Sequence, residues 1–144
     1  NGDGYYYYKN IAIDAIEVGN GCGETIISSM PYTNSFEDGI EWLNDGALSW
    51  RNFSNTTSPG NGPPSAASGA KFLCVETTPG QSAILLSPCI NLGMFPQMAF
   101  QYFQSLHSGD LTLEISQDGI VWSRIWNSTG NGGSNWLNAS LDLQ

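Results

Sequence analysis

The chain has 144 residues, a length that suits one domain with a core of its own. Four Lys and Arg residues stand against thirteen Asp and Glu residues, and the resulting net charge of −9 repels nucleic-acid backbones and anionic membranes. No apolar run reaches the roughly 20 residues of a membrane span. Only 12% of the residues are charged, a balance typical of secreted β-proteins. We therefore expect a secreted or cell-surface protein that neither binds nucleic acid nor inserts into a membrane.

The first predicted strand covers residues 5–18 and is rich in aromatic and β-branched residues. It opens with four consecutive tyrosines, two on each face of the strand. Either the second face lies under a loop, or it forms a surface that contacts a sugar or a neighbouring subunit. Residues 11–18 are apolar on both faces, so they are predicted to lie inside a sheet. The tyrosines of this candidate surface are Tyr5, Tyr6, Tyr7 and Tyr8.

The middle of the chain is punctuated by turn residues. A glycine-rich linker at residues 19–23 precedes a short extended piece at 25–32, and a new unit starts at 35–39. Residues 41–50 are predicted as a short turn or an irregular loop. Residues 52–70 are dominated by Ser, Thr, Pro, Gly and Asn, and a loop of that length is either functional or mobile.

Strand patterns dominate the second half of the chain. Residues 71–76 and 82–87 predict a hairpin whose Pro-Gly pair favours a type II turn. Residues 98–126 predict a three-strand antiparallel meander, because alternating runs flank two turns. Residues 136–143 form the last predicted strand. Short strands with frequent turns and no helix predict an all-β fold, a two-sheet antiparallel β-sandwich of jelly-roll type.

Tryptophans and cysteines are assigned mainly to the interior. Trp50, Trp122 and Trp126 recur at strand positions that usually fill the core of such a sandwich. Three cysteines allow one disulfide with one thiol left over, and none has metal-type spacing. They are either buried thiols or include a bridge from Cys89 to Cys22 or to Cys74.

Several of these segments together resemble a MAM domain, in the bacterial form of Bacteroidetes proteins, which is similar to the cleaved-adhesin modules of gingipain-like proteins. The resemblance covers most of residues 36–143, and the order of the motifs carries it. It implies a jelly-roll fold and an extracellular adhesion role. The motifs are residues 36–39, 50–52, 62–67, 72–76, 83–88 and 111–122.

One departure from the family pattern concerns strand order. In the family, the strand that resembles residues 10–18 closes the domain at its C-terminus, after a strand of the type GQTVxLRF that has no counterpart here. Residues 10–18 can complete either the sandwich formed by residues 36–143 of the same chain or that of another copy. We favour the second, and expect residues 1–21 to be the closing strand of a preceding or neighbouring unit plus a linker. Residues 22–144 are expected to be a MAM-like jelly roll that lacks its own last strands. Its unpaired edges invite an incoming strand.

Catalysis is not expected, because the chemistry-bearing residues are too few. His107 is the only histidine, and no motif supplies it with a nucleophile and an orienting carboxylate. Jelly-roll glycosidases use two carboxylates across the sugar, whereas Glu114 stands alone on its strand.

A structural calcium ion is the favoured chemical hypothesis. Glu37 and Asp38 start the domain, and by resemblance Asp14 lies in the strand beside that start, where related modules hold calcium. Carboxylate and carbonyl oxygens suit Ca²⁺. Solvated carboxylates are the alternative. Glu76 and Asp45 are weaker candidate ligands.

The predicted function is a non-catalytic extracellular adhesion or protein-interaction module. It is expected to be a repeat unit of a cell-surface protein or filament that assembles by strand complementation with other copies or adjacent repeats. The alternative is a carbohydrate-binding accessory domain of a secreted hydrolase or protease, with a polysaccharide or a cell-surface protein as ligand.

Overall fold

The computed structural model describes residues 9–14, 26–55, 61–106, 108–130 and 133–143, and for residues 9–14 it describes the backbone. All regular structure in these ranges is β-strand, which confirms the predicted all-β class. The same ranges contain no helix that is long and apolar enough to cross a membrane. The strands are β1 (Lys9–Asp14), β2 (Ile26–Ile27), β3 (Leu43–Gly46), β4 (Arg51–Phe53), β5 (Phe72–Thr77), β6 (Ala83–Leu86), β7 (Cys89–Ile90), β8 (Gln97–Gln104), β9 (Leu111–Ile115), β10 (Ser123–Ser128) and β11 (Leu137–Asp142).

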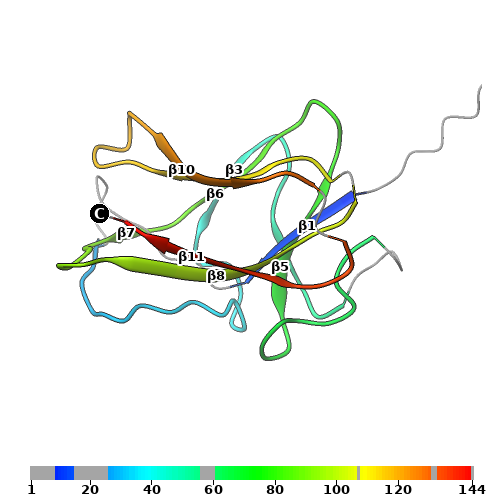
Figure 1. Ribbon diagram of the computed structural model, residues 1–144, viewed down its shortest axis with the longest axis horizontal. Coiled ribbons are helices and arrows are strands. Elements are labelled where there is room, and N and C mark those ends of the chain that lie inside the picture. The colour runs from blue at the N-terminus through cyan, green and yellow to red at the C-terminus, as the bar shows by residue number, and fades with distance from the viewer. Residues whose placement is uncertain (1–8, 15–25, 56–60, 107, 131–132, 144) are drawn as a thin grey trace, which may run out of the picture.

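The strands lie in two layers (Figure 1). One layer is a five-stranded sheet with the order β11-β8-β1-β5-β4. The other layer holds two small sheets, β10-β9 and β3-β6, and a third small sheet, β2-β7, lies near one end. Within the described residues the backbone hydrogen bonds therefore form one large and three small sheets. A jelly roll with two continuous sheets stays a prediction.

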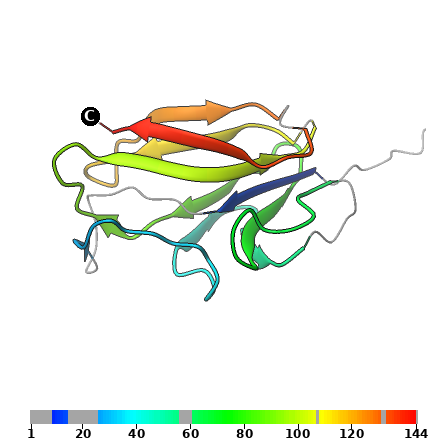
Figure 2. The same cartoon turned by 60° about the horizontal axis from the view of Figure 1, so that its bottom comes forward.

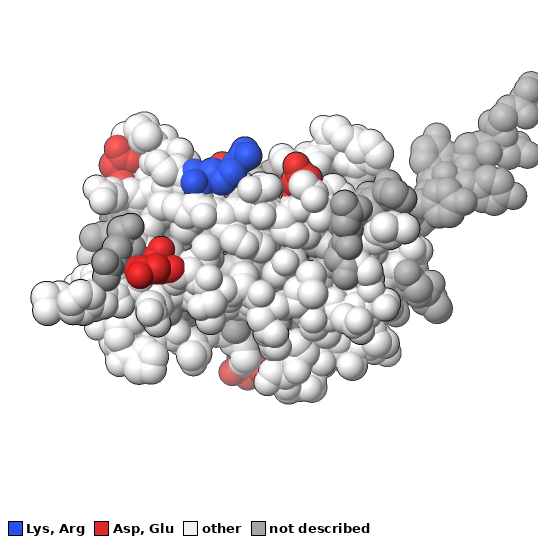
Figure 3. Space-filling model, viewed as in Figure 1, with Lys and Arg blue, Asp and Glu red and all other residues white. Residues whose placement is uncertain are grey.

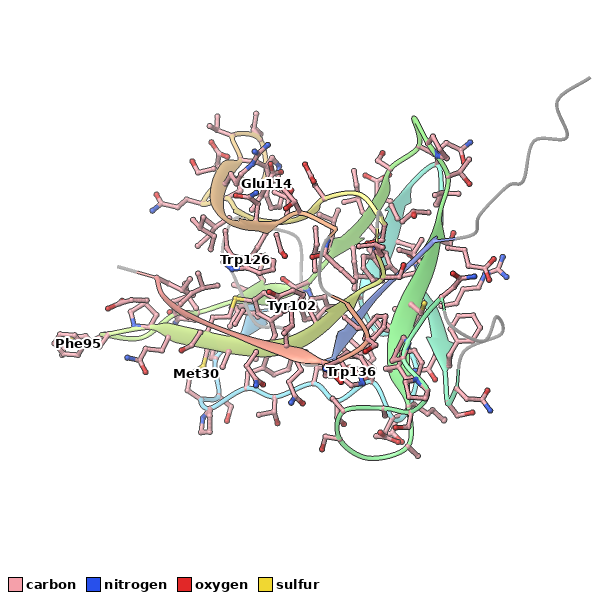
Figure 4. All side chains as sticks on the ribbon, turned by 45° about the vertical axis from the view of Figure 1, so that its right-hand side comes forward. Met30, Phe95, Tyr102, Glu114, Trp126 and Trp136 are labelled. Atoms are coloured by element: carbon pink, nitrogen blue, oxygen red, sulfur yellow. The ribbon has the colours of Figure 1, made fainter. Side chains whose placement is uncertain are left out.

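The core lies between the layers and is built by alternate residues of facing strands. β5 contributes Leu73 and Val75, and β8 contributes Met98 and Phe100, all at most 4% exposed. Trp126 of β10 packs against them from the other layer, with its ring edge-on to Phe100 at 5.1 Å between centroids. Figure 4 shows Trp126 and Tyr102 between the layers. Trp50 is also buried, so two of the three predicted core tryptophans are confirmed.

A second, smaller cluster lies on the opposite face of the five-stranded sheet. Phe72 and Cys74 alternate with the core residues of β5 and pack there with Phe103. Trp136 covers this cluster, and its indole N–H donates to the Ser65 carbonyl at 2.9 Å. The predicted long loop is thus held against the outer face by this contact, which leaves β5 buried on both faces over residues 72–75.

The cysteines divide into one buried thiol and one bridged residue. Cys74 is free, and burial, assisted by the negative charge of Glu76, raises the pKa of its thiol to about 12. Cys89 is bonded in a disulfide. Because Cys74 is free, the predicted Cys74–Cys89 bridge is wrong, and the Cys22–Cys89 alternative remains, although Cys22 lies outside the described residues.

Two predicted strand pairings are wrong. The Pro-Gly turn forms, with the Gln81 N–H donating to the Thr78 carbonyl at 3.1 Å and Gly80 at φ 79°. However, the turn passes the chain between layers, because β5 pairs with β1 and β4 whereas β6 pairs with β3. The predicted meander also divides, since β8 pairs with β1 and β11 and only β9 and β10 form the hairpin. Alternation specifies which face of a strand is dry, but not which strand lies beside it.

Candidate interaction site

Strand β1 occupies the centre of the five-stranded sheet. It pairs antiparallel with β5 on one edge, from Lys9 opposite Thr77 to Ile13 opposite Leu73. On the other edge it pairs with β8, from Ile11 opposite Gln104 to Asp14 opposite Gln101. Among the described strands, β1 alone joins the β11-β8 pair to the β5-β4 pair. The sheet therefore depends on a strand from the extreme N-terminal part of the chain.

The pairing confirms that part of the first predicted strand lies inside a sheet. In this single chain, β1 pairs with β5 and β8 of its own chain, whereas we expected it to pair with a preceding or neighbouring unit. A β1 strand from the same chain and a β1 strand from a second copy would present the same backbone groups to β5 and to β8. The own-chain pairing shows that the register fits this sheet, and whether a second copy also supplies the strand stays a prediction.

The start of the MAM-like unit is a tight corner at Phe36. Phe36 is 1% exposed and has a φ of 58°, a left-handed conformation that costs energy for a bulky residue. Its N–H donates to the Asn34 side chain at 2.9 Å, and its carbonyl accepts from the Asn52 side chain. Its ring packs edge-on against Trp42 at 5.6 Å. These contacts stabilise a strained turn that directs the next residue, Glu37, outward.

Glu37 ties this corner to the chain entering β5. One carboxylate oxygen accepts from the Ala70 N–H at 2.9 Å and from the Lys71 N–H at 3.0 Å, while the Lys71 ammonium donates to the Glu37 carbonyl at 2.7 Å. Gly69 leaves room for the carboxylate, because a Cβ at that position would collide with it. The two backbone N–H groups lower the pKa of Glu37, and the charge of Lys71 adds to the effect.

The lowered pKa of Glu37 predicts an acid-sensitive contact. A carboxyl whose folded pKa lies below its ordinary value of 4.5 stabilises the fold fully above that pH, and the contribution disappears as the pH falls through the folded pKa. The variant Glu37→Gln keeps an acceptor oxygen but cannot titrate. We expect its melting temperature to lie below that of the parent chain at pH 7 and the difference to shrink as the pH falls below 4.5. A difference that stays constant down to pH 3 would contradict this assignment.

The predicted calcium ligands are only partly brought together. Asp14 follows Ile13, which pairs with Leu73, so its backbone lies at the end of β5 where Glu37 binds Lys71. Asp38 is exposed beside a pocket of about 180 Å³. The described side chains contain no group of three or more His, Cys, Asp or Glu residues that could hold a metal ion, but the Asp14 side chain is not among them. The pocket lies between Tyr32 and Glu41 and is lined by residues 32–39 and 41.

The weaker ligand candidates lie on separate strands. Asp45 is in β3, in one layer, and Glu76 is in β5, in the other. Tyr5, Tyr6, Tyr7 and Tyr8, the predicted partner surface, and His107 lie outside the described residues. Glu114, labelled in Figure 4, is exposed and projects away from the sandwich, opposite Arg124 of β10. Among the described strands, the residue directly opposite Glu114 is therefore basic.

Two apolar loop tips at one end of the molecule were not predicted (Figure 1). Met94 and Phe95, between β7 and β8, are 87% and 75% exposed, and Phe95 has a strained φ of 60°. Figure 4 shows Phe95 projecting beyond the ribbon. Ile120 and Val121, between β9 and β10, are 82% and 66% exposed. Exposed apolar residues on loops often mark contact sites. In the sequence, each of these loop tips could have been found as a pair of apolar residues next to turn residues.

Trp122 belongs to the second loop tip, and its predicted place in the core is wrong. It is 46% exposed. The reason is the turn that precedes it, where the Asp118 carboxylate accepts from the N–H groups of Ile120 and Val121, both at 2.8 Å. This turn extends through Trp122, because β10 starts only at Ser123. The tryptophan is therefore still in the loop.

Charge is sparse on the surface. Figure 3 shows a face that is mostly uncharged, with separate acidic side chains and one small basic area. Such a face does not form the continuous basic stripe that nucleic acids require.

Comparison with known proteins gives one match. A family model described as MAM domain, meprin/A5/mu, matches residues 34–144. Searches of curated proteins and of solved structures found no significant match. The matched range begins at the Phe36 corner and includes all strands from β3 to β11, whereas β1 and β2 precede it.

Proposed function

The chain belongs to the MAM domain family, and from this premise we propose that it is a non-catalytic adhesion module whose copies are joined by exchange of strand β1. MAM domains are extracellular adhesion-type modules of extracellular or membrane-associated proteins. The proposal adds that this chain is a repeat unit of a cell-surface protein or filament. It also adds that the chain is a MAM domain of the bacterial, Bacteroidetes type, similar to the modules of gingipain-like proteins.

One observation carries the proposal. The family model matches residues 34–144, yet the central strand of the large sheet is Lys9–Asp14, outside that range. The matched unit thus takes a strand from a segment that precedes it. A segment before one unit can complete its own unit or the unit of a neighbouring copy with the same backbone pairing. Exchange of an identical element between protomers is a low-cost route to association.

The geometry of the connection permits either source. Residues 15–25 link β1 to β2, and 11 residues span up to roughly 36 Å at roughly 3.3 Å each. The pairs that β1 makes with β5 and β8 are backbone hydrogen bonds, which any copy of the strand supplies equally well. In this proposal the fold is a two-sheet jelly roll, and the small sheets β10-β9 and β3-β6 are parts of its second sheet.

Concentration-dependent assembly tests the proposal. We expect sedimentation velocity of the whole chain to show dimers or longer assemblies that increase with concentration, since exchange converts own-chain pairing into pairing between chains. A chain without residues 1–19 should form none of them. A whole chain that stays monomeric from micromolar to millimolar concentration would contradict exchange.

We also propose a structural calcium ion at the Phe36 corner, held by Glu37, Asp38 and Asp14. The support is the register that brings the Asp14 backbone to the end of β5 where Glu37 binds, together with the acidic pocket beside Asp38. One carboxylate oxygen of Glu37 accepts from Ala70 and Lys71, and its carbonyl accepts from the Lys71 ammonium. Its second carboxylate oxygen is therefore the donor that it would offer to the ion.

Removal of calcium is expected to lower the melting temperature. A ligand present at 100 times its dissociation constant and bound only by the folded chain adds about 2.7 kcal/mol of stability. For a domain of this size that corresponds to a shift of roughly 5–10 °C. The measurement is thermal unfolding in calcium and in EDTA, with Asp38→Asn as the site variant and the exposed Asp110→Asn as its control. Identical curves for the parent chain in the two buffers would rule out the site.

A carbohydrate-binding accessory role is the second candidate, favoured by the exposed aromatic rings of Phe95 and Trp122. Aromatic faces on loops can stack against sugar rings. Affinity electrophoresis in gels that contain soluble polysaccharides distinguishes the two candidates, because only this second function predicts retardation that is lost in Phe95→Ala and Trp122→Ala.

A further inference from the structure

The exposed apolar side chains of this chain gather at one end of the sandwich. In the described part of the chain ten large apolar side chains are exposed, and five of them belong to the two loop tips. One tip leads into β8 of the five-stranded sheet, and the other joins β9 to β10 in the second layer. Figures 1 and 2 both show the two tips at the end of the molecule where the chain leaves β11. The five side chains are those of Met94, Phe95, Ile120, Val121 and Trp122.

The tip between β9 and β10 satisfies its own backbone donors. The Gly119 N–H donates to the Ser116 hydroxyl at 2.8 Å. The N–H groups of Ile120 and Val121 donate to the Asp118 carboxylate, both at 2.8 Å. Three successive backbone donors are therefore bound without water. A segment that leaves water for an apolar phase needs this, because an unsatisfied N–H group is costly there.

The tip between β7 and β8 is also suited to leave water. Residues 91–96 carry no charge. Pro96 has no N–H group, and its carbonyl accepts from the Leu143 N–H at 3.0 Å. Phe95 holds a strained φ of 60° with its ring exposed, and Figure 4 shows the ring projecting beyond the ribbon. The chain thus presents an apolar ring where burial in its own fold would be the default.

The arrangement of the tips favours a lipid surface as their partner. A protein partner would need a separate pocket for each tip, because the tips project from different layers. A fluid lipid interface takes up projecting apolar side chains at any spacing, and tryptophan prefers the level of the headgroups. Neither tip contains Lys or Arg, and the chain has a net charge of −9, which repels anionic lipids. A neutral lipid surface therefore fits best.

We propose that the two tips insert together into the headgroup region of a neutral, phosphatidylcholine-type membrane and hold this end of the module on the lipid surface. The lack of a membrane span and the negative charge predicted that the chain does not insert into a membrane. Insertion of loop tips at headgroup depth departs from that prediction, since it needs neither a span nor a positive charge. The proposal is independent of the source of β1, which contributes no residue to the tips.

Flotation of the whole chain with phosphatidylcholine vesicles tests the proposal. We expect the chain to float with the vesicles, and less of it to float when phosphatidylserine is added to them. Phe95→Ala and Ile120→Ala should each lower the partition coefficient about 5-fold or more, because each removes apolar area that the lipid buries. Leu106→Ala is the matched control. Leu106 is 60% exposed but follows the end of β8 opposite to the end that Phe95 precedes, so its loss should not change flotation.

Tryptophan quenching by brominated phosphatidylcholine locates the contact. Trp122 is 46% exposed, whereas Trp42 and Trp50 are buried and the other two tryptophans are partly buried. We expect the brominated vesicles to quench the fluorescence of the parent chain. Trp122→Phe should remove most of that quenching while the variant still floats. Quenching that is unchanged in Trp122→Phe would place the lipid contact elsewhere and overturn the proposal.

A folded whole chain that does not float with neutral vesicles would overturn the proposal. Equal flotation of Phe95→Ala and the parent chain would overturn it as well. Retardation by a soluble polysaccharide that is lost in Phe95→Ala, without flotation, would assign the tips to the carbohydrate-binding candidate instead. Sedimentation velocity of the same samples separates this inference from strand exchange. A chain that assembles but does not float contradicts only the lipid contact, and a monomeric chain that floats contradicts only the exchange.

Discussion

Deletion of residues 1–19 is expected to cause the largest loss of stability of any change considered. It removes β1 and separates the β11-β8 pair from the β5-β4 pair. Both flanking strands lose their central hydrogen-bond partner, and the buried Val75 and Phe103 lose the strand that lies directly opposite them. At about 1 kcal/mol for each backbone hydrogen bond, the loss is on the order of 5–10 kcal/mol, comparable to the whole stability of a domain.

The measurement is thermal unfolding followed by circular dichroism, with rescue in trans as the control. A peptide that spans residues 5–18, added to the truncated chain, should restore a cooperative transition. A peptide with the same composition in scrambled order should not. A truncated chain that melts at the temperature of the whole chain would show that β1 is dispensable to the sheet.

The second large effect is expected for Phe100→Ala. Phe100 is 4% exposed and contacts both Tyr102 and Trp126, so the substitution leaves a cavity between the layers. Removal of a buried Phe typically costs about 3–5 kcal/mol. At roughly 2–4 °C for each kcal/mol, the melting temperature should fall by roughly 6–20 °C.

Phe95→Ala is the matched control, because it deletes the same side chain where 75% of it is exposed. It should change the stability by less than about 0.5 kcal/mol. Phe95→Gly should raise the stability slightly, since glycine adopts a φ of 60° without strain. Equal destabilisation by Phe95→Ala and Phe100→Ala in urea unfolding would mean that the core does not lie between the two layers.

The sequence predicted the strand content of this fold better than its pairing. The alternating pattern within residues 98–126 agrees with the structure, in which Leu111, Leu113 and Ile115 lie on the core face of β9. It could not show that β8 pairs with β1, some 90 residues away in the sequence, because a strand pattern contains no information about a partner distant in the chain. Local turn chemistry was correctly recognised at Pro79-Gly80, yet the same turn serves a hairpin and a crossover between layers.

The candidate site, like the fold, could be predicted from the sequence only in part. Resemblance pointed to Glu37, but the binding of its carboxylate by Ala70 and Lys71 depends on the long loop folding back to the start of β5. The half-exposed Trp122 was wrongly assigned to the core, because an apolar residue after a turn shows the same pattern whether the strand resumes at once or later.

Disulfide trapping between copies tests the exchange of β1 most directly. Asn10 and Glu76 are directly opposed in the pairing of β1 with β5, at a separation suited to a disulfide. One chain carries Asn10→Cys, the other carries Glu76→Cys, and a single chain with both substitutions is the control. The native Cys74 thiol does not compete, since it is buried and its pKa is raised to about 12. We predict a covalent dimer when the two single variants are mixed and oxidised. Closure of the bond only within the doubly substituted monomer, with no covalent dimer from the mixture, would contradict exchange.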